Sequence, residues 1–193
     1  MNEVETFFDK CACSWDKNEC HSIEEKKYLL DKVDIKPNSK ILDIACGTGV
    51  ITRLLHEYSN SVVKGIDISQ NMIDIAKKKY QLDNWATFEK CDFINSKEQN
   101  YYDYAIIYNA YPHFLDVEAF AKKLSEVLKK GGKFAILHSL SRFELQRHHS
   151  DRAVNVSRTL NAPLIESKVF EPYFDIIEAS ETEHTFVLIG RKK

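Results

Sequence analysis

The sequence predicts an α/β fold in which helices cover both faces of an open, mostly parallel sheet. The first observation is a strand-length apolar run over residues 40–45, followed at once by the glycine turn Gly47-Thr48-Gly49 and a helical pattern over residues 48–58. The second is that apolar runs and helical patterns keep alternating along the chain. Ligands of such sheets bind outside the carboxyl ends of the strands, so the glycine turn marks a candidate binding site.

The next elements repeat this alternation. The apolar run over residues 62–68 carries Asp67 at its end, and Ser69 can cap a helix over residues 70–80. Two further runs are rich in β-branched and aromatic residues, which favours strands. These runs cover residues 85–91 and 102–108.

The second half of the chain continues in the same way. Asp116 can cap a helix that runs to Lys130 with one apolar stripe, and Gly131-Gly132 is expected to end it. A fifth strand then covers residues 133–137. The last two strands are expected to form an antiparallel hairpin with a short polar turn. They cover residues 173–179 and 185–190.

Two segments lie outside this regular alternation. Residues 1–37 precede the first strand, and residues 139–172 separate the fifth strand from the hairpin, which is too long for a simple crossover. Both segments contain helical patterns. The expected helices cover residues 3–10, 23–33, 141–149 and 151–160.

Length and composition narrow the class of protein. The chain of 193 residues suits one domain with a full core. Its net charge is −2, and no basic stretch is long enough to indicate a nucleic-acid partner. No apolar run reaches transmembrane length, and the polar, acidic N-terminus is unlike a secretory signal. The odd count of 5 cysteines favours reduced thiols. We therefore expect a cytoplasmic protein that binds neither membranes nor nucleic acids.

The residues around the glycine turn discriminate between two kinds of nucleotide-type cofactor. A dinucleotide site needs Gly-x-Gly-x-x-Gly with the pyrophosphate at the helix N-terminus, but Thr52 occupies the third glycine position. Asp43, just before the turn, would also place negative charge near a pyrophosphate. A cofactor with a cationic end and no phosphate fits better. S-adenosylmethionine, which carries an ammonium and a sulfonium, is such a cofactor.

The segment from Asp43 to Gly49 resembles the first motif of the class I S-adenosylmethionine-dependent methyltransferases, which is an acidic residue, three further residues and Gly-x-Gly. The resemblance extends over roughly residues 40–140 and is to the members that act on small molecules. It implies a three-layer, Rossmann-like fold with seven strands, the last of them antiparallel. It also implies a single domain, residues 1–193. Its parts are a helical lid at 1–37, a cofactor-binding core at 40–138, a substrate-side insertion at 139–172 and a C-terminal hairpin at 173–191.

The resemblance further implies roles for residues at the strand ends. Asp67 is expected to accept hydrogen bonds from ribose hydroxyls, as the acid about 20 residues after the turn does in nucleotide-binding folds. Asp92 is expected to bind the adenine amino group, the alternative being a helix or turn cap. Ile68 and Met72 pack on the adenine or, alternatively, are ordinary core residues. The predicted cofactor site consists of Asp43, Cys46, Gly47, Thr48, Gly49, Asp67, Ile68, Met72, Asp92, Phe93, Asn109 and Ala110.

Methyl transfer from this cofactor needs mainly binding and orientation, and a base only where the acceptor must lose a proton. His113, after the fourth strand, is the candidate catalytic base, because an unperturbed histidine titrates near neutral pH. The alternative is a histidine that only positions its loop, and His138 is a second candidate base. The predicted substrate side consists of Phe8, Trp15, Tyr111, His138 and His148.

A group of residues in the N-terminal segment has the ligand types of a zinc site. Cys11, Cys13, Cys20 and His21 lack the usual zinc-site spacing, however. Partly buried lid cysteines are the favoured interpretation, so we predict no metal.

The function predicted from these features is methyl transfer from S-adenosylmethionine, the expected cofactor, to a small-molecule partner. Two alternatives stay open at this point. One is methylation of RNA or protein. The other is a non-catalytic cofactor- or metal-binding protein of the same fold, because function belongs to sites rather than to folds.

Overall fold

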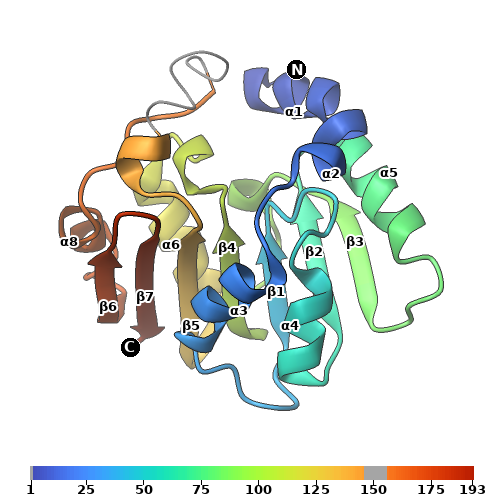
Figure 1. The fold of residues 1–193 in the computed structure, drawn as a ribbon. Coiled ribbons are helices and arrows are strands. Elements are labelled where there is room, and N and C mark those ends of the chain that lie inside the picture. The colour runs from blue at the N-terminus through green and yellow to red at the C-terminus, as the bar shows by residue number, and fades with distance from the viewer. Residues whose placement is uncertain (1, 146–155) are drawn as a thin grey trace.

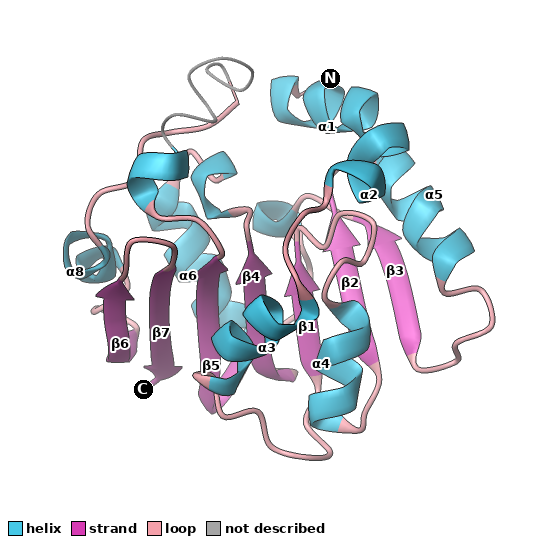
Figure 2. Ribbon diagram, in the orientation of Figure 1, coloured by secondary structure: helices cyan, strands magenta, loops and turns pink. Residues whose placement is uncertain are grey.

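The computed structural model describes residues 2–145 and 156–193, and its centre is one seven-stranded sheet. The strand order is β3-β2-β1-β4-β5-β7-β6, as Figure 1 and Figure 2 show. Neighbouring strands among β1 to β5 pair in parallel, and β7 is antiparallel to both of its neighbours. The predicted sheet, mostly parallel with an antiparallel last strand, is thereby confirmed. The strands are β1 Ile41–Ile44, β2 Val63–Asp67, β3 Ala86–Lys90, β4 Tyr102–Tyr108, β5 Leu128–His138, β6 Phe174–Glu181 and β7 Phe186–Lys192.

Helices surround this sheet, and most of them connect successive strands. Ser69 and Asp116 cap two of them, as predicted: Ser69 Oγ accepts from the Met72 N–H at 3.2 Å, and Asp116 Oδ1 accepts from the Ala119 N–H at 2.9 Å. The described α-helices are α1 Glu3–Cys11, α2 Trp15–Asn18, α3 Ile23–Asp31, α4 Thr52–Ser59, α5 Gln70–Lys79, α6 Val117–Val127 and α8 Pro163–Glu166. The described 3-10 turns are η1 Ala12–Ser14, η2 Phe93–Asn95, η3 Tyr111–His113 and η4 Ser167–Val169.

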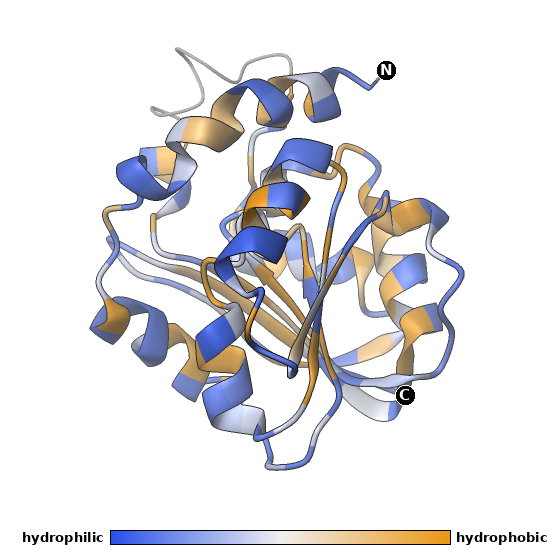
Figure 3. Ribbon diagram, turned by 90° about the vertical axis from the view of Figure 1, so that its right-hand side faces the viewer, coloured by the Kyte–Doolittle hydropathy of each residue, from blue (hydrophilic) through white to orange (hydrophobic). Residues whose placement is uncertain are grey.

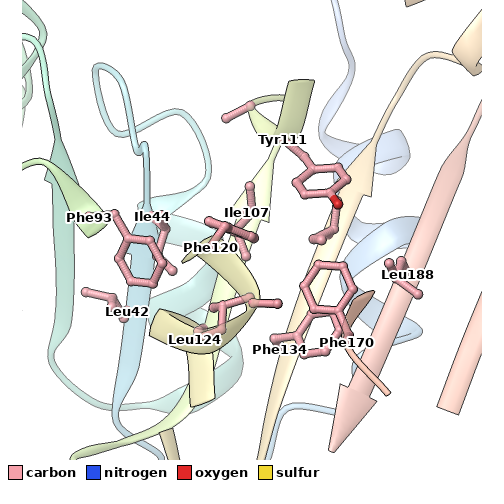
Figure 4. Close-up of a cluster of buried hydrophobic side chains, with 14 of the residues drawn as sticks. Leu42, Ile44, Phe93, Ile107, Tyr111, Phe120, Leu124, Phe134, Phe170 and Leu188 are labelled. Atoms are coloured by element: carbon pink, nitrogen blue, oxygen red, sulfur yellow. The ribbon is translucent and has the colours of Figure 1, made fainter. Parts of the chain in front are cut away.

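Both faces of the sheet are buried, which is typical of parallel sheets covered by helices. Alternate residues of β4 belong to two different clusters: Ala105 and Ile107 pack with α6, and Tyr104 and Ile106 pack with residues of α3 and α4. Figure 4 shows the α6 side, where Phe120 lies beside Ile107. In Figure 3 the apolar residues gather along the strands and the inner faces of the helices. The core therefore forms two layers, one on each side of the sheet.

The predicted end of the helix before β5 is wrong. Helix α6 ends at Val127, and Gly131 and Gly132 lie inside β5 rather than at a helix C-terminus. Leu128 already pairs with Tyr102 of β4, and the register shifts before Lys133. A Cβ on Gly132 would lie 2.9 Å from the carbonyl oxygen of Lys129, so Gly132 allows the close approach at this irregularity, and Gly131 supplies a left-handed φ of 78°.

The helix after the glycine turn also begins later than predicted. Helix α4 starts at Thr52 rather than at residue 48, because the chain between β1 and Thr52 forms a turn with left-handed backbone conformations. Residues of this turn line the candidate site at the strand ends.

The segment after β5 differs from its prediction in part. Residues 142–145 are helical, within the helix predicted for residues 141–149, and the rest of that helix lies outside the described residues. Residues 156–160 are not helical, because the Arg158 N–H donates to the Pro112 carbonyl at 2.9 Å instead of to its own segment. The chain forms α8 after them, which starts with a proline at its first position.

Helices α1 and α2 lie over the edge of the sheet at which the parallel strands end (Figure 1). Figure 1 shows α1 and α2, in blue, above the carboxyl ends of β1 and β2 and beside α5. None of the helices in the described part of the chain is both long and apolar enough to cross a membrane.

Candidate functional site

The glycine turn joins β1 to α4 through left-handed backbone conformations, which residues other than glycine rarely adopt. Ala45, Gly47 and Gly49 have φ angles of 52°, 56° and 78°. The Gly49 N–H donates to the Cys46 carbonyl at 2.9 Å, and the Cys46 N–H donates to the Ile66 carbonyl at 3.0 Å. Glycine reaches the left-handed region at little steric cost, so the turn can be tight and still tied to β2.

The two glycines of this turn face different surroundings. A Cβ on Gly47 would lie 3.5 Å from Trp15 Nε1 and 4.0 Å from Met72 Sδ, which are ordinary contact distances. A Cβ on Gly49 would lie 2.7 Å from the ring of Tyr80, well inside contact distance. A Cβ on Gly47 would therefore fit without a clash, and Gly47 lines the cavity described below, whereas Gly49 packs into the core and does not line that cavity.

Asp67 at the end of β2 connects the turn to α5. Its Oδ2 accepts from the Gly47 N–H at 2.9 Å, and its Oδ1 accepts from the Ser69 N–H at 2.8 Å. An ionised carboxylate offers about four lone-pair sites, so the group has acceptor capacity beyond these two bonds. Asp67 thus shapes the turn and still faces the site.

Asp43 lies beneath the turn and is 1% exposed. Its Oδ2 accepts from Thr52 Oγ1 at 2.8 Å. Burial raises the pKa of Asp43 to about 7 and that of Asp67 to about 6, because a charged carboxylate is disfavoured away from water. A nearby cation would favour the charged form of both groups.

These raised pKa values predict that Asp43 and Asp67 stabilise the ligand-free protein less as the pH rises. An unfolded aspartate titrates near pH ~3.9, so between roughly pH 4 and 7 these two groups bind more protons in the folded protein than in the unfolded chain. Their contribution to the free energy of unfolding therefore falls with increasing pH in this range. Asp43→Asn cannot ionise and should lose less stability over the range, by roughly 3 kcal/mol at most. Urea unfolding of both proteins at several pH values measures this, and parallel pH dependences would contradict the assignment.

Two more predicted cofactor residues, Asp92 and Asn109, form hydrogen bonds close to the strand ends. The Asp92 carboxylate accepts from the Ile94 N–H at 3.2 Å and from Asn95 Nδ2 at 2.8 Å, so it has the capping role that was the alternative interpretation. Asn109 has a φ of 53°, and its side chain exchanges two hydrogen bonds with Ser139, at 2.8 and 2.9 Å. Both side chains are only partly buried, and both line the cavity described next.

A cavity of about 280 Å³ opens at the carboxyl ends of β1, β2 and β4. Its walls are mostly apolar, and its described lining contains five carboxylic acids but no lysine or arginine, which favours a ligand with positive charge. The acids are Glu19, Asp43, Asp67, Asp92 and Asp116. The predicted residues in the lining are Phe8, Trp15, Asp43, Cys46, Gly47, Asp67, Ile68, Met72, Asp92, Phe93, Asn109, Ala110 and His113.

Carboxylates hold the N-terminal segment over this cavity. Asp9 of α1 accepts from Ser69 Oγ at 2.6 Å, and Asp16 of α2 lies 2.7 Å from Lys79 Nζ. Asp16 also accepts from Thr48 Oγ1 at 2.5 Å, so the Thr48 side chain is engaged outside the cavity lining. The contacts fix α1 against the start of α5, and α2 against the glycine turn and the last residue of α5.

His113 lies on η3, after β4, and lines the cavity. Its ring packs edge-on against Phe8 of α1, with the ring centres 4.8 Å apart, and Phe8 in turn packs against Trp15 at 5.7 Å. His113 Nδ1 lies 2.8 Å from the Val156 carbonyl oxygen. The N-terminal segment and the chain after β5 therefore meet at His113.

Three predicted substrate-side residues are not found in the described cavity lining. Tyr111 is fully buried, and its hydroxyl donates to Glu166 Oε2 at 2.9 Å. His138 is also fully buried, with its ring 5.8 Å from that of Phe186. His148 lies outside the described residues.

Two acids in the lining were missed by the sequence analysis. Asp116 was interpreted only as a helix cap, although its position just after the loop that follows β4 was a usable signal. Glu19 has no motif around it, and only the folding of the N-terminal segment brings it to the cavity. Elsewhere in the described chain, no three histidine, cysteine or acidic side chains gather as a metal site, and Cys13 and Cys20 are exposed thiols.

Comparison of the sequence with known proteins finds methyltransferases. The profile of a family described as a methyltransferase domain matches residues 35–180. An uncharacterized methyltransferase of Schizosaccharomyces pombe is 32% identical over 111 residues, which are 52% of this chain and 39% of that protein. The chain spans between 30% and 62% of the length of the first curated relatives that it matches.

Solved structures share the fold. A chain in the complex of the Haloferax volcanii Trm112 methyltransferase activator with a methyltransferase aligns with a TM-score of 0.85 at 16% identity, covering 98% of this chain and 97% of that one. Haemonchus contortus phosphoethanolamine N-methyltransferase 2, in complex with S-adenosyl-L-methionine, aligns with a TM-score of 0.73 at 21% identity, covering 91% of this chain and 45% of that one. At these identities the likeness establishes the common fold.

Proposed function

We propose, on the premise that this chain belongs to the methyltransferase domain family, that it transfers a methyl group from S-adenosylmethionine to a small-molecule acceptor. The observation that carries the proposal is the acidic cavity with mostly apolar walls at the carboxyl ends of β1, β2 and β4. A sulfonium cofactor brings positive charge and no phosphate. Five carboxylic acids and no described lysine or arginine suit such a ligand and would repel a pyrophosphate.

The cofactor residues follow from the positions of these acids. The acceptor capacity that remains on Asp67 after its bonds to Gly47 and Ser69 suits two ribose hydroxyls. Asp92, with Phe93 beside it, is the partner for the adenine amino group, and Ile68 and Met72 form the apolar wall for the ring. Asp43, at the other end beneath the turn, faces the amino-acid end. Electrostatic attraction to the bound cation favours ionised Asp43 and Asp67, whose pKa values burial raises.

The cofactor supplies an activated methyl group when it is bound. The residues of this chain have three tasks: they bind the two reactants, align the acceptor atom with the methyl group and exclude water. Alignment alone contributes roughly 7–11 kcal/mol in favourable cases. Phe8 and Trp15 line the cavity from the N-terminal segment, which we assign as the lid that keeps water out. His113 is the base where the acceptor must lose a proton.

A small acceptor is favoured because the N-terminal segment forms part of the cavity wall: Phe8, Trp15 and Glu19 line the cavity together with residues at the strand ends. The carboxylate contacts of Asp9 and Asp16 hold this segment in place, where it limits the room for an acceptor. The methyltransferase of known structure from Haloferax volcanii is in complex with an activator protein, so a macromolecular acceptor or partner is the second candidate.

Cofactor binding is tested by tryptophan fluorescence during titration with S-adenosylhomocysteine. Trp15 lines the cavity, whereas Trp85 stacks on His56 with ring centres 4.2 Å apart and does not. We expect a saturable change in fluorescence that Trp15→Phe removes and the matched control Trp85→Phe retains. If Trp85→Phe lost the signal and Trp15→Phe kept it, the ligand would bind outside the proposed cavity.

Activity is tested by incubating the protein with methyl-labelled S-adenosylmethionine and a cell extract separated into small molecules, RNA and proteins. We expect label in the small-molecule fraction, where mass spectrometry identifies the acceptor. Label in the RNA or protein fraction would contradict a small-molecule acceptor and favour a macromolecular one. No label in any fraction, together with no fluorescence change, would contradict the proposed function.

A further inference from the structure

A second segment of the chain is tied to the loop that carries His113. Three groups of this loop bond to residues at the start of the described range 156–193. They are the His113 ring, the Pro112 carbonyl and the Phe114 carbonyl. His113 Nδ1 lies 2.8 Å from the Val156 carbonyl oxygen, the Arg158 N–H donates to the Pro112 carbonyl at 2.9 Å, and Arg158 Nε donates to the Phe114 carbonyl at 3.3 Å. The main chain is therefore held on both sides of His113, and its ring is held as well.

Arg158 is itself held by a buried carboxylate. Its guanidinium donates to both oxygens of Glu166, at 2.9 and 2.8 Å, and the Glu166 side chain is 4% exposed. The same carboxylate accepts from the Asn161 N–H at 2.8 Å and from the Tyr111 hydroxyl at 2.9 Å. A bidentate pair with these added bonds fixes the orientation of the guanidinium. Glu166 thus joins both segments at one point.

The ionic state of this pair agrees with its geometry. Burial alone would raise the pKa of Glu166, but the hydrogen bonds from Arg158 and from the Asn161 backbone outweigh burial and lower that pKa. Glu166 is therefore a charged partner near neutral pH, and the guanidinium also lies over the Tyr111 ring, 4.5 Å from its centre. The side chain of Tyr111 serves this network instead of the cavity.

The bond between His113 and Val156 decides which ring nitrogen carries the proton. A carbonyl oxygen only accepts hydrogen bonds, so Nδ1 must be the donor. In a neutral histidine with a proton on Nδ1, the lone pair is on Nε2. The ring itself lines the cavity and packs edge-on against Phe8.

We propose that Arg158 and Glu166 are positioning residues that hold the Val156 carbonyl against His113, and so keep its neutral ring in the Nδ1–H form. In this form Nε2 carries the lone pair. It takes the proton that the acceptor loses and later releases it to water. Neither Arg158 nor Glu166 lines the cavity, so both act through His113. The inference rests on the proposed function for the use of the base, but the form of the ring can be measured without any cofactor.

The test is nitrogen-15 NMR of protein labelled in its histidines, recorded without cofactor at a pH at which the His113 ring is neutral. The His113 signals are identified by their loss in His113→Gln. We expect the proton on Nδ1 in the wild-type protein. The double variant Arg158→Met, Glu166→Leu removes both charges, so no unpaired buried charge is left to unfold the protein. Its His113 signals should shift towards a mixture of the two neutral forms, and single Glu166→Gln should shift them in the same direction.

The matched control is the double variant Arg142→Met, Glu181→Leu. This pair is also an arginine–glutamate contact, at 3.1 Å, between the chain after β5 and the hairpin, but it has no bond to the His113 loop. It should keep the wild-type His113 signals. A wild-type proton on Nε2, or an unchanged His113 in a folded Arg158 and Glu166 variant, would overturn the inference. The NMR result is independent of cofactor binding, so a failure of the proposed function is recognised separately by titration.

Discussion

Replacing Asp67 with alanine is expected to remove most of the stabilisation of this protein by S-adenosylhomocysteine. A ligand at about 100 times its dissociation constant stabilises the folded state by ~2.7 kcal/mol, which is a clear shift of the melting temperature. Asp67 is the residue whose loss should remove most of that shift. Its carboxylate both faces the cavity and holds the Gly47 N–H at 2.9 Å, so alanine removes a proposed ribose acceptor and loosens the turn beside it.

The Asp67→Ala variant is also expected to be less stable than the wild-type protein when no ligand is bound. The N–H groups of Gly47 and Ser69 lose their acceptor, at a cost of roughly 1–3 kcal/mol for a buried donor left without a partner. The quantity to compare is therefore the ligand-induced shift and not the melting temperature itself. Asp83→Ala is the matched control, because Asp83 contacts Arg53 at 3.0 Å and does not line the cavity. A full shift in Asp67→Ala would refute the proposed cofactor site.

Gly49→Ala is expected to give the largest loss of stability among the glycine substitutions in the turn. The added Cβ would lie 2.7 Å from the Tyr80 ring and 3.3 Å from Phe88, and the φ of 78° is strained for any residue with a Cβ. Left-handed strain of roughly 1–2 kcal/mol and overpacking of roughly 1–3 kcal/mol act together. We expect the free energy of unfolding, measured in urea, to fall by about 2–5 kcal/mol.

Gly131→Ala separates the two causes of this loss. Gly131 has the same φ of 78°, but nothing lies within 4 Å of the position that a Cβ would take. It should therefore show the conformational strain alone, about 1–2 kcal/mol. Equal losses for the two variants would mean that the Tyr80 and Phe88 rings move aside without cost, and that the core beneath the turn is looser than these contacts indicate.

Residues close together in the sequence account for the successful part of the fold prediction. The apolar run before Gly47, the caps at Ser69 and Asp116, and the aromatic run from Tyr102 to Tyr108 each depend on neighbours a few positions away. Because parallel strands end at one edge of a sheet, residues that follow these strands were expected to meet, and most of the predicted cofactor residues do line one cavity.

Side-chain direction within the η3 turn could not be predicted in the same way. Tyr111 and His113 are two residues apart, and both were expected on the substrate side. A 3-10 turn has about three residues per turn, so side chains two positions apart point in different directions. His113 lines the cavity, whereas Tyr111 is buried against Phe120 and Phe170, with ring centres 5.6 and 6.1 Å away.

The pair Gly131-Gly132 illustrates a competition that local sequence does not reveal. Glycines after an amphipathic helix usually end it, and the pattern before them was helical. The backbone of Leu128 instead pairs with Tyr102 of β4, and its side chain is fully buried. Pairing with a strand more than 20 residues earlier in the chain outweighs the helical preference of the last turn.

The sequence by itself determined the order of strands and helices, the glycine turn and its acids, because these depend on periodicity, caps and motif spacing along the chain. Only the tertiary structure decided that Glu19 reaches the cavity, that Asp67 braces the turn through Gly47, and that Arg158 and Glu166 hold the loop of His113. These contacts join residues far apart in the chain. Their geometry follows from how the lid and the segment after β5 pack on the sheet, which no local pattern specifies.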